Sequence, residues 1–239
     1  MKIGPSTGWL YAIEISDMNE HKKIIDTAGM NLFEICCYQW GDERIDAILN
    51  SKNLTGYTYK SIHLPNMKQI SDLDELYKMK KIVNDHKIKT CVIHRDGFLN
   101  QGKYLNQIIT ELNKPITIEN LDGSRDNKRE IEDLQILKND YEVSFMLDVQ
   151  HAYEHDHSMN YAKELYSFME DKLTHLHVSG ETENNIHSLV HKSRNAKEII
   201  DFLGYIFSKK KVPIVLEGEY KTAQELKKER EFLEKELGK

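Results

Sequence analysis

Eight short apolar segments recur along the chain at fairly even intervals, and longer amphipathic stretches separate them. Strand-like segments that alternate with helical ones are typical of a parallel sheet built from βαβ units. We predict strands at 2–5, 32–37, 59–64, 90–94, 116–119, 143–147, 173–178 and 212–217. Eight such units fit a closed barrel better than an open sheet. The sequence therefore predicts a single α/β domain over residues 1–239, folded as a (β/α)8 TIM barrel.

The stretches between these strands carry signals that start and stop helices. Gly29 is placed to end a first helix at about 17–28, and Ser71 is a candidate N-cap for a helix after the third strand. Thr222 and Glu225 form a capping-box pattern before a charged final helix that ends near residue 237. Further helices are expected from about residue 42 and near 100–112, 128–139, 158–170 and 195–208.

The size and composition of the chain agree with such a barrel. At 239 residues and 28.0 kDa it has the length of one α/β barrel. No apolar run approaches the roughly 20 residues that span a bilayer, and the first residues lack the pattern of a secretory signal. We therefore expect a soluble, cytoplasmic protein with no membrane partner. Cys36, Cys37 and Cys91 are too few for a disulfide framework and are expected to be reduced and mostly packed.

The net charge of −6 bears on the partners of the protein. Proteins that track DNA usually carry a basic stripe, because neutralised phosphates supply most of their non-specific affinity. This chain has no overall excess of basic residues, although a local basic rim is compatible with the same net charge. Nucleic acid is therefore a disfavoured partner.

Nearly every predicted strand from the third onward ends in a residue type that binds metal ions. The carboxyl ends of parallel barrel strands open on one face, so residues far apart in the sequence converge there. A lone histidine at a strand end is most often packed or exposed, but chance rarely places this residue class at six strand ends together. The sequence predicts a metal site formed by His63, His94, Glu119, Asp148, His151, His177 and Glu217.

Some histidines are expected to lie outside this site. His21 and His86 fall on amphipathic helices, so we expect both side chains to be exposed. His175 and His177 share the predicted strand at 173–178. We expect only His177 to face the lumen of the barrel, because it lies nearer the end of the strand.

Residues in the predicted loops are candidates for contact with a substrate. His187 and His191 lie in the long loop after the strand at 173–178, where either could bind a further metal or contact substrate. Trp9, Trp40 and Arg95 also occupy predicted loops. We predict that Trp9, Trp40, Arg95 and His191 bind the substrate.

The ordered motifs SIHLP, LDVQHA, HLHVSGE and VLEGE resemble the xylose isomerase-like TIM barrel superfamily, and the resemblance covers essentially the whole chain. This superfamily includes sugar isomerases and epimerases and the DNA-repair enzyme endonuclease IV. The resemblance implies that the main metal is surrounded by Glu119, Asp148, His177 and Glu217.

Endonuclease IV holds further metals, and part of their ligand set has counterparts here. His63 and His94, with Glu119 bridging, resemble its second metal site. His151 and His187 match two ligands of its third metal. The remaining ligand of that third site is normally acidic, and here the position is Asn185. This departure argues against a complete trinuclear site.

Two metal-dependent reactions remain in competition. In an isomerase or epimerase of sugars or sugar phosphates, the metal polarises a carbonyl while Glu119 and Glu217 transfer the proton beside it. In an endonuclease IV-like phosphodiesterase of the AP endonuclease type, paired metals would generate a hydroxide and stabilise the attacking and leaving oxygens. His63 and His94 favour this second reaction, whereas the acidic net charge, the altered third site and the short chain favour the first.

We take the isomerase or epimerase as the prediction and the phosphodiesterase as the alternative. A metal-binding barrel without catalytic activity is a third hypothesis, less favoured because open carboxylate-rich sites on this face normally serve chemistry. The cofactor is predicted to be one to three divalent ions. Mixed nitrogen and oxygen ligands suit zinc, manganese, cobalt or iron, and the sequence does not choose among them.

Overall fold

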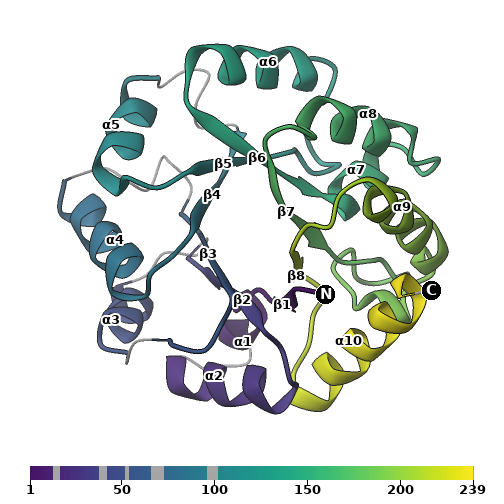
Figure 1. Cartoon of the computed structure of the whole chain (residues 1–239), viewed down its shortest axis with the longest axis horizontal. Helices are drawn as coiled ribbons and strands as arrows, with labels where there is room; N and C mark the ends of the chain where they lie inside the picture. Colours follow the sequence, from purple (N-terminus) through teal and green to yellow (C-terminus); the bar gives the residue numbers. More distant parts are fainter. Residues whose placement is uncertain (13–16, 38–41, 52–53, 66–72, 96–101, 239) are drawn as a thin grey trace.

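The protein is a barrel of eight parallel strands, seen in a computed structural model that describes all residues except 13–16, 38–41, 52–53, 66–72, 96–101 and 239. The strands follow the order β1-β8-β7-β6-β5-β4-β3-β2, with parallel pairing throughout (Figure 1). Their bounds are β1 Ile3–Pro5, β2 Leu32–Cys36, β3 Tyr59–His63, β4 Thr90–His94, β5 Ile116–Glu119, β6 Val143–Asp148, β7 Leu173–Val178 and β8 Ile214–Leu216.

The barrel closes where β1 meets β2. A parallel bridge joins Ser6 to Glu34, and the backbone N–H of Thr7 donates to the carbonyl of Glu34 at 2.9 Å. The two strands approach so closely that a Cβ atom on Gly4 would lie 1.7 Å from the carbonyl oxygen of Leu32. The predicted (β/α)8 TIM barrel is therefore confirmed.

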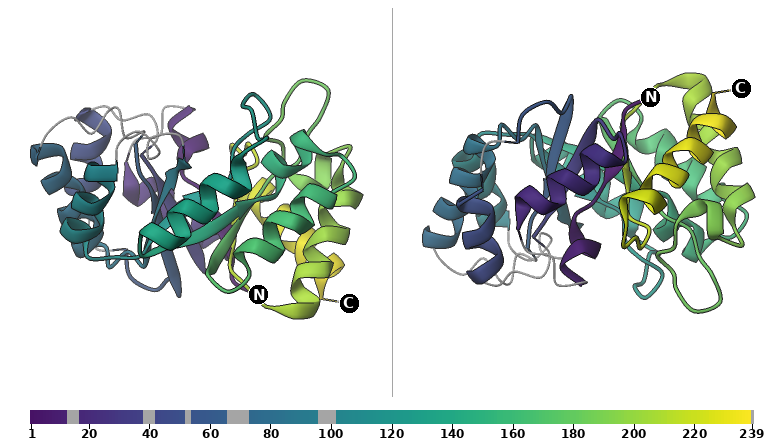
Figure 2. Two further views of the ribbon diagram at one scale, coloured as in Figure 1. Left: turned by 90° about the horizontal axis from the view of Figure 1, so that it is seen from above. Right: turned by 90° about the horizontal axis from the view of Figure 1, so that it is seen from below.

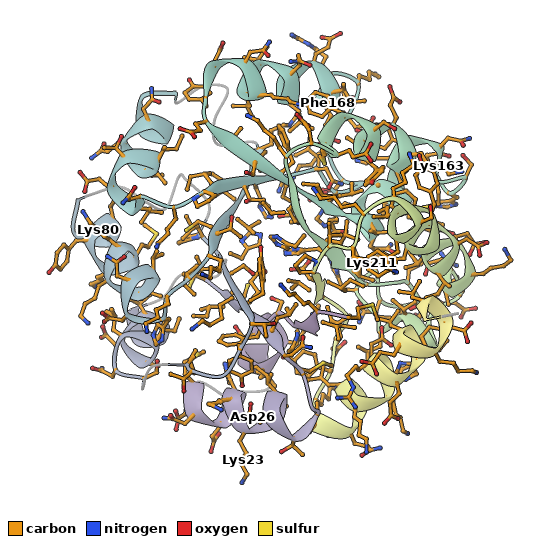
Figure 3. All side chains as sticks on the ribbon, in the orientation of Figure 1. Lys23, Asp26, Lys80, Lys163, Phe168 and Lys211 are labelled. Atoms are coloured by element: carbon orange, nitrogen blue, oxygen red, sulfur yellow. The ribbon has the colours of Figure 1, made fainter. Side chains whose placement is uncertain are left out.

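Helices form a ring outside the strands, and the two ends of the chain lie side by side (Figures 1 and 2). Lys23 and Asp26 are exposed on α2 and point away from the barrel (Figure 3). The helices are α1 Gly8–Ala12, α2 Met18–Thr27, α3 Asp42–Leu49, α4 Leu73–Asp85, α5 Gly102–Leu112, α6 Glu130–Asp140, α7 Val149–His155, α8 Asn160–Met169, α9 Ala196–Lys209 and α10 Ala223–Leu237, with a short 3-10 helix η3 at Val190–Lys192. Among the described residues, no helix has both the length and the hydropathy that a membrane span would need.

Most of the predicted helix signals act as expected. Gly29 has a φ of +70°, the left-handed conformation that ends α2. Thr222 accepts a hydrogen bond from the N–H of Glu225 at 3.2 Å, as in a capping box. In a capping box the glutamate side chain accepts a hydrogen bond from the N–H of the N-cap residue. Here the Glu225 carboxylate instead accepts from the N–H of Lys221, one residue before the N-cap Thr222. Ser71 lies outside the described residues.

The structure also contains helices that the sequence patterns did not predict. The short helices α1 and α7 each follow a strand closely, and η3 lies in the loop after β7. Asp148 explains α7, since its Oδ1 accepts the N–H of His151 at 2.8 Å and thereby caps the helix. The spacing of Asp148 and His151 is thus a helix start as well as a pair of candidate ligands.

His21 and His86 are buried, with 0% and 1% of their surfaces exposed, so the prediction that they are exposed was wrong. His21 shares the inward face of α2 with Met18 and Ile25, at helical spacing. His86 directly follows α4, and its Nε2 lies 3.1 Å from the carbonyl oxygen of Ile48. A histidine whose ring nitrogen has a hydrogen-bond partner can be buried at little cost.

The three cysteines are packed as thiols, as predicted. Cys37 and Cys91 are buried and Cys36 is half-buried. Burial raises the pKa of the Cys91 thiol to about 12, so this side chain stays protonated and behaves as a small apolar group.

Candidate metal centre

A group of four potential ligands gathers at the carboxyl end of the barrel strands. Glu119 ends β5, Asp148 ends β6, His177 lies near the end of β7, and Glu217 directly follows β8. One ligand atom from each lies within 4.8 Å of the others. The strands of the barrel all run in the same direction, so residues at their carboxyl ends lie close together at one end of the lumen.

His177 lies among the carboxylates of this group. Its Nδ1 is 3.1 Å from Oε1 of Glu217 and 3.6 Å from Oε1 of Glu119. His177 and Glu119 are buried, whereas the Glu217 side chain is 17% exposed. The open side of the group is therefore at Glu217, where a small molecule could reach it.

A second group shares Glu119. Oε2 of Glu119 lies 3.0 Å from Nε2 of His63 and 2.9 Å from Nε2 of His94. The two imidazole rings pack edge to face with centroids 4.8 Å apart. Glu119 thus stands between the two groups of potential ligands, with one carboxylate oxygen turned toward each.

Burial and charge act against each other in these groups. Burial and the nearby carboxylates of Glu217 and Glu119 raise the pKa of Asp148 to about 6. Burial alone would raise the pKa of Glu119 as well, but His94, His177 and His63 hold it well below its usual range. The lumen therefore gathers more negative charge than an apolar interior tolerates without cations.

The same balance favours the charged form of two histidines. Burial opposes the charge on His63, but the hydrogen bond and the charge of Glu119 outweigh it and raise its pKa to about 9. Asp148 and Glu119 likewise outweigh burial at His151, whose pKa is also raised to about 9. Without a metal ion, protons on these imidazoles supply the positive charge that the carboxylates require.

The donor set fits a divalent cation. Oδ2 of Asp148 is buried and has no hydrogen-bond partner among the described residues. The nearest imidazole nitrogen, Nε2 of His151, is 3.9 Å away. A buried carboxylate oxygen without a donor is costly unless a cation neutralises it. Three carboxylates and one imidazole, from Glu119, Asp148, Glu217 and His177, match the ligands of zinc, manganese, cobalt or iron.

His151 and His187, the predicted ligands of a further metal, approach each other at one side of the group. Their ring centroids are 5.9 Å apart, and Nδ1 of His187 lies 3.2 Å from Oγ of Ser179. Asn185 occupies the expected acidic position. It accepts a hydrogen bond from the N–H of His187 at 2.8 Å and donates to Glu219 at 2.8 Å. Asn185 thus fastens this loop.

The predicted substrate-binding residues lie in different places. Trp9 is at the site, since its Nε1 donates to the backbone carbonyl of Glu217 at 2.6 Å. Arg95 is buried and its guanidinium pairs with Asp133 of α6 at 2.6 Å. His191 is paired with Glu229 of α10, at 2.5 Å, and Trp40 is outside the described residues. Among the three that the structure describes, Trp9 is the one with a hydrogen bond to a candidate ligand.

The sequence patterns missed Glu34 and misjudged His175. Both are buried in the lumen, where Nε2 of His175 lies 3.7 Å from Oε2 of Glu34. The prediction that only His177 faces the lumen was wrong, because residues two apart on a strand point to the same face. For Glu34 a signal existed: a charged residue between Phe33 and Ile35 in an apolar strand requires a buried partner.

Asn120 is a further residue that the sequence patterns missed. Its Oδ1 accepts the N–H of Asp148 at 2.7 Å, and its Nδ2 donates to the carbonyl of Asp148 at 3.1 Å. Asn120 directly follows Glu119 in the chain, and its side chain holds the backbone of Asp148. It therefore connects two of the candidate ligands. No periodicity marks this role, since it depends on the neighbouring strand.

No protein family model matches this chain, and no curated protein matches it in sequence. Solved structures do match it in fold. A D-tagatose 3-epimerase-like protein has 15% identity and a TM-score of 0.69, with 100% of this chain and 97% of that chain covered. A xylose isomerase domain containing protein from Salmonella typhimurium LT2 has 10% identity and a TM-score of 0.70, with the same coverage. The chain therefore has the fold of the xylose isomerase-like TIM barrels, the superfamily that its strand-end motifs resemble.

Proposed function

We propose that this protein is a divalent-metal-dependent isomerase or epimerase that acts on a sugar or a sugar phosphate. The observation that carries the proposal is the group of Glu119, Asp148, His177 and Glu217 at the open end of the barrel. The fold is shared with a D-tagatose 3-epimerase-like protein and with a xylose isomerase domain containing protein, and these neighbours support the same class of substrate.

A bound divalent ion would hold adjacent oxygens of a hydroxy-carbonyl sugar and increase the acidity of the C–H bond beside the carbonyl. Glu119 and Glu217 are the proton-transfer pair in this proposal. Burial works against ionisation of both side chains, but neighbouring histidines lower the pKa of each, so both are carboxylates at neutral pH. An ionised carboxylate next to the substrate can accept the proton, and its conjugate acid can return one.

Trp9 and the buried surroundings support the same chemistry. The indole N–H of Trp9 holds the backbone of Glu217, so Glu217 is attached to α1 as well as to β8. His177 and Asp148 are fully buried, which keeps the reacting carboxylates in an environment with little water.

Metal content and proton exchange test this proposal. We expect at least one divalent ion per chain by inductively coupled plasma mass spectrometry, and turnover of one member of a panel of ketoses and sugar phosphates. In D2O the product should carry deuterium at the carbon beside the carbonyl, because a C–H bond is broken and formed. Metal binding without turnover or exchange on any sugar would favour the non-catalytic barrel instead.

Glu119→Gln and Asp148→Asn should abolish turnover and lower the metal content while leaving the barrel folded. Glu229→Gln is the matched control, because Glu229 is equally buried but binds the backbone of Val190 at 2.6 Å, away from the candidate ligands. Circular dichroism checks the fold of all three variants. Unchanged turnover in both site variants would refute the assignment.

The phosphodiesterase remains a second candidate because of the group formed by His63, His94 and Glu119. Two imidazoles and a shared carboxylate suit a second metal. A variant that carries both His63→Ala and His94→Ala distinguishes the two reactions. If the protein is a phosphodiesterase, this variant should lose one metal per chain and all cleavage of abasic DNA. If it is a mononuclear isomerase, the variant should keep its metal.

A further inference from the structure

Glu34 is a buried carboxylate that belongs to neither of the two groups of potential ligands that share Glu119. It lies in β2, across the lumen from β7, and none of its surface is exposed. Its Oε2 accepts a hydrogen bond from Oγ of Ser61 at 2.9 Å. Its two oxygens lie 3.2 and 3.3 Å from Nε2 of His177. A charge at this depth persists only where the surrounding groups compensate it.

The two ring nitrogens of His177 face opposite ways. Nε2 points into the barrel toward Glu34, whereas Nδ1 points to the mouth, toward Glu217 and Glu119. In a neutral imidazole one nitrogen carries the proton and the other has the lone pair that can bind a metal. A carboxylate on one nitrogen keeps the proton there, so the other nitrogen is the ligand.

We propose that Glu34 is a positioning residue, which holds His177 in its Nε2-protonated form and so reserves Nδ1 for a divalent cation shared with Glu119, Asp148 and Glu217. This inference rests on the proposed metal dependence of the protein. It adds a residue that does not touch the cation but determines which nitrogen of His177 binds it.

A layer of polar side chains keeps Glu34 in place. His175 approaches Oε2 of Glu34 with Nε2, at 3.7 Å. The other nitrogen of His175 lies 3.0 Å from the hydroxyl of Tyr59 and 2.8 Å from the hydroxyl of Thr174. Strands β2, β3 and β7 each contribute to this layer, so Glu34 cannot turn away from His177 without breaking several buried contacts.

Glu34, His175 and His177 also bring ligand atoms within 4.8 Å of one another, which raises the alternative that a cation binds among them directly. That arrangement would use Nε2 of His177 as the ligand. Nδ1 would then carry the proton and face Glu119 and Glu217, so a cation bound by these two carboxylates would have no nitrogen ligand from His177. We favour the positioning role because it leaves Nδ1 of His177 available as a ligand beside Glu119, Asp148 and Glu217, the group that is open to solvent at Glu217.

Metal affinity tests the proposal without any assay of turnover. Metal-free protein is titrated with cobalt(II), followed by the absorption of the bound ion and by competition with a chelator. Glu34→Gln should bind the same number of ions with an affinity about 10- to 100-fold weaker, the usual cost of losing an outer partner of a ligand histidine. Ser61→Ala, which removes one hydrogen bond to Glu34, should cause a smaller loss.

Glu229→Gln serves as the matched control, since it removes a buried carboxylate that has no contact with His177, and its cobalt affinity should equal that of the unaltered protein. If the unaltered protein binds cobalt and Glu34→Gln binds it equally well, the positioning role is refuted and the proposed function stands. If the unaltered protein binds no divalent ion, both proposals fail.

The unaltered protein also provides a direct test of which nitrogen of His177 binds the ion. Protein labelled with 15N-histidine and loaded with 113Cd2+ is observed by NMR, and His177→Gln assigns the signals. The proposal requires coupling of cadmium to Nδ1 of His177 and a proton on Nε2. Coupling of cadmium to Nε2 would overturn it and favour a cation beside Glu34.

Discussion

Asn120 connects two strands of the candidate metal centre through a single side chain. Its amide makes reciprocal hydrogen bonds with the backbone N–H and C=O of Asp148, at 2.7 and 3.1 Å. All of these atoms are buried, so no water replaces a lost partner. The ladder between β5 and β6 extends to Glu119, and Asn120 continues the connection by one further residue.

Asn120→Ala should therefore be costly. It leaves the N–H and the C=O of Asp148 without partners, and each buried unsatisfied group costs about 1–3 kcal/mol. We expect the free energy of unfolding in urea to fall by several kcal/mol and the metal to be bound more weakly. Asn139→Ala, at an exposed position on α6, is the matched control and should change stability by no more than about 0.5 kcal/mol. Equal stabilities for the two variants would show that Asn120 does not hold the strand end.

At the scale of elements, the two carboxylate oxygens of Asp148 have different roles at the junction between β6 and α7. Oδ1 of Asp148 caps α7 by accepting the N–H of His151. Oδ2 is left buried without a hydrogen-bond partner among the described residues. The helix start thus fixes the orientation of the side chain and directs the second oxygen into the lumen, where a cation can bind it.

The contact between β1 and β2 is the most demanding junction of the barrel. Gly4→Ala would place a methyl group 1.7 Å from the carbonyl oxygen of Leu32, so the strands must separate. We expect a loss of at least about 3 kcal/mol in the free energy of unfolding, measured in urea. Gly204→Ala is the control on an exposed turn of α9, where nothing lies within 4 Å of the new methyl group.

The control should have the opposite sign. Alanine in an exposed helix interior is favoured over glycine by about 1 kcal/mol, so Gly204→Ala should stabilise the protein slightly. If both alanine variants behaved alike, steric closure at Gly4 would not be what holds β1 against β2.

At the scale of the whole molecule, the barrel concentrates charge at its centre while the outer helices carry exposed ion pairs. The side chains of Glu34, Glu119 and Asp148 are buried in one lumen. Exposed pairs such as Lys197 with Asp201 contribute little to stability, because water screens them. The ionisation of the lumen therefore dominates how the stability of the metal-free protein changes with pH.

The metal-free protein should lose stability as the pH rises from roughly 7 to about 9. The folded pKa of His63 and of His151 is raised to about 9, from 6.5 in an unperturbed side chain. Each imidazolium therefore stabilises the fold fully below pH 6.5, and the contribution disappears as the pH passes 9. The melting temperature of chelator-treated protein should fall by several degrees over this range.

Saturating divalent metal is the control for this pH series. A bound ion replaces the protons on the ligand groups, so the melting temperature of the loaded protein should change much less over the same range. A melting temperature that does not depend on pH in the metal-free protein would show that the histidines of the lumen are not charged in the folded state.

The positions of the strands and the residues at their ends could be read from the sequence. The predicted strand at 90–94 matches β4, and that at 116–119 matches β5, because a buried strand leaves a short apolar run bounded by polar residues. The convergence of Glu119 and Asp148 follows from the parallel topology alone. These inferences needed no knowledge of side-chain packing.

Other residues of the candidate site could not be found in this way. Glu34 interrupts an apolar strand, but the sequence does not say that His177 faces it from the opposite side of the lumen. Arg95 has the charge expected of a substrate contact, yet it pairs with Asp133 on a neighbouring helix. Which partner a charged side chain reaches depends on distances across the fold, and sequence periodicity describes only one element at a time.

The sequence by itself determined the alternation of strands and helices and the metal-binding residue types at the strand ends, because these depend on local patterns of burial and on chain order. The tertiary structure decided how the ring nitrogens of His177 are divided between Glu34 and the mouth of the barrel. It also decided that Asn185 fastens a loop and that Asn120 holds Asp148. These roles are set by contacts between elements that are brought together only when the barrel closes.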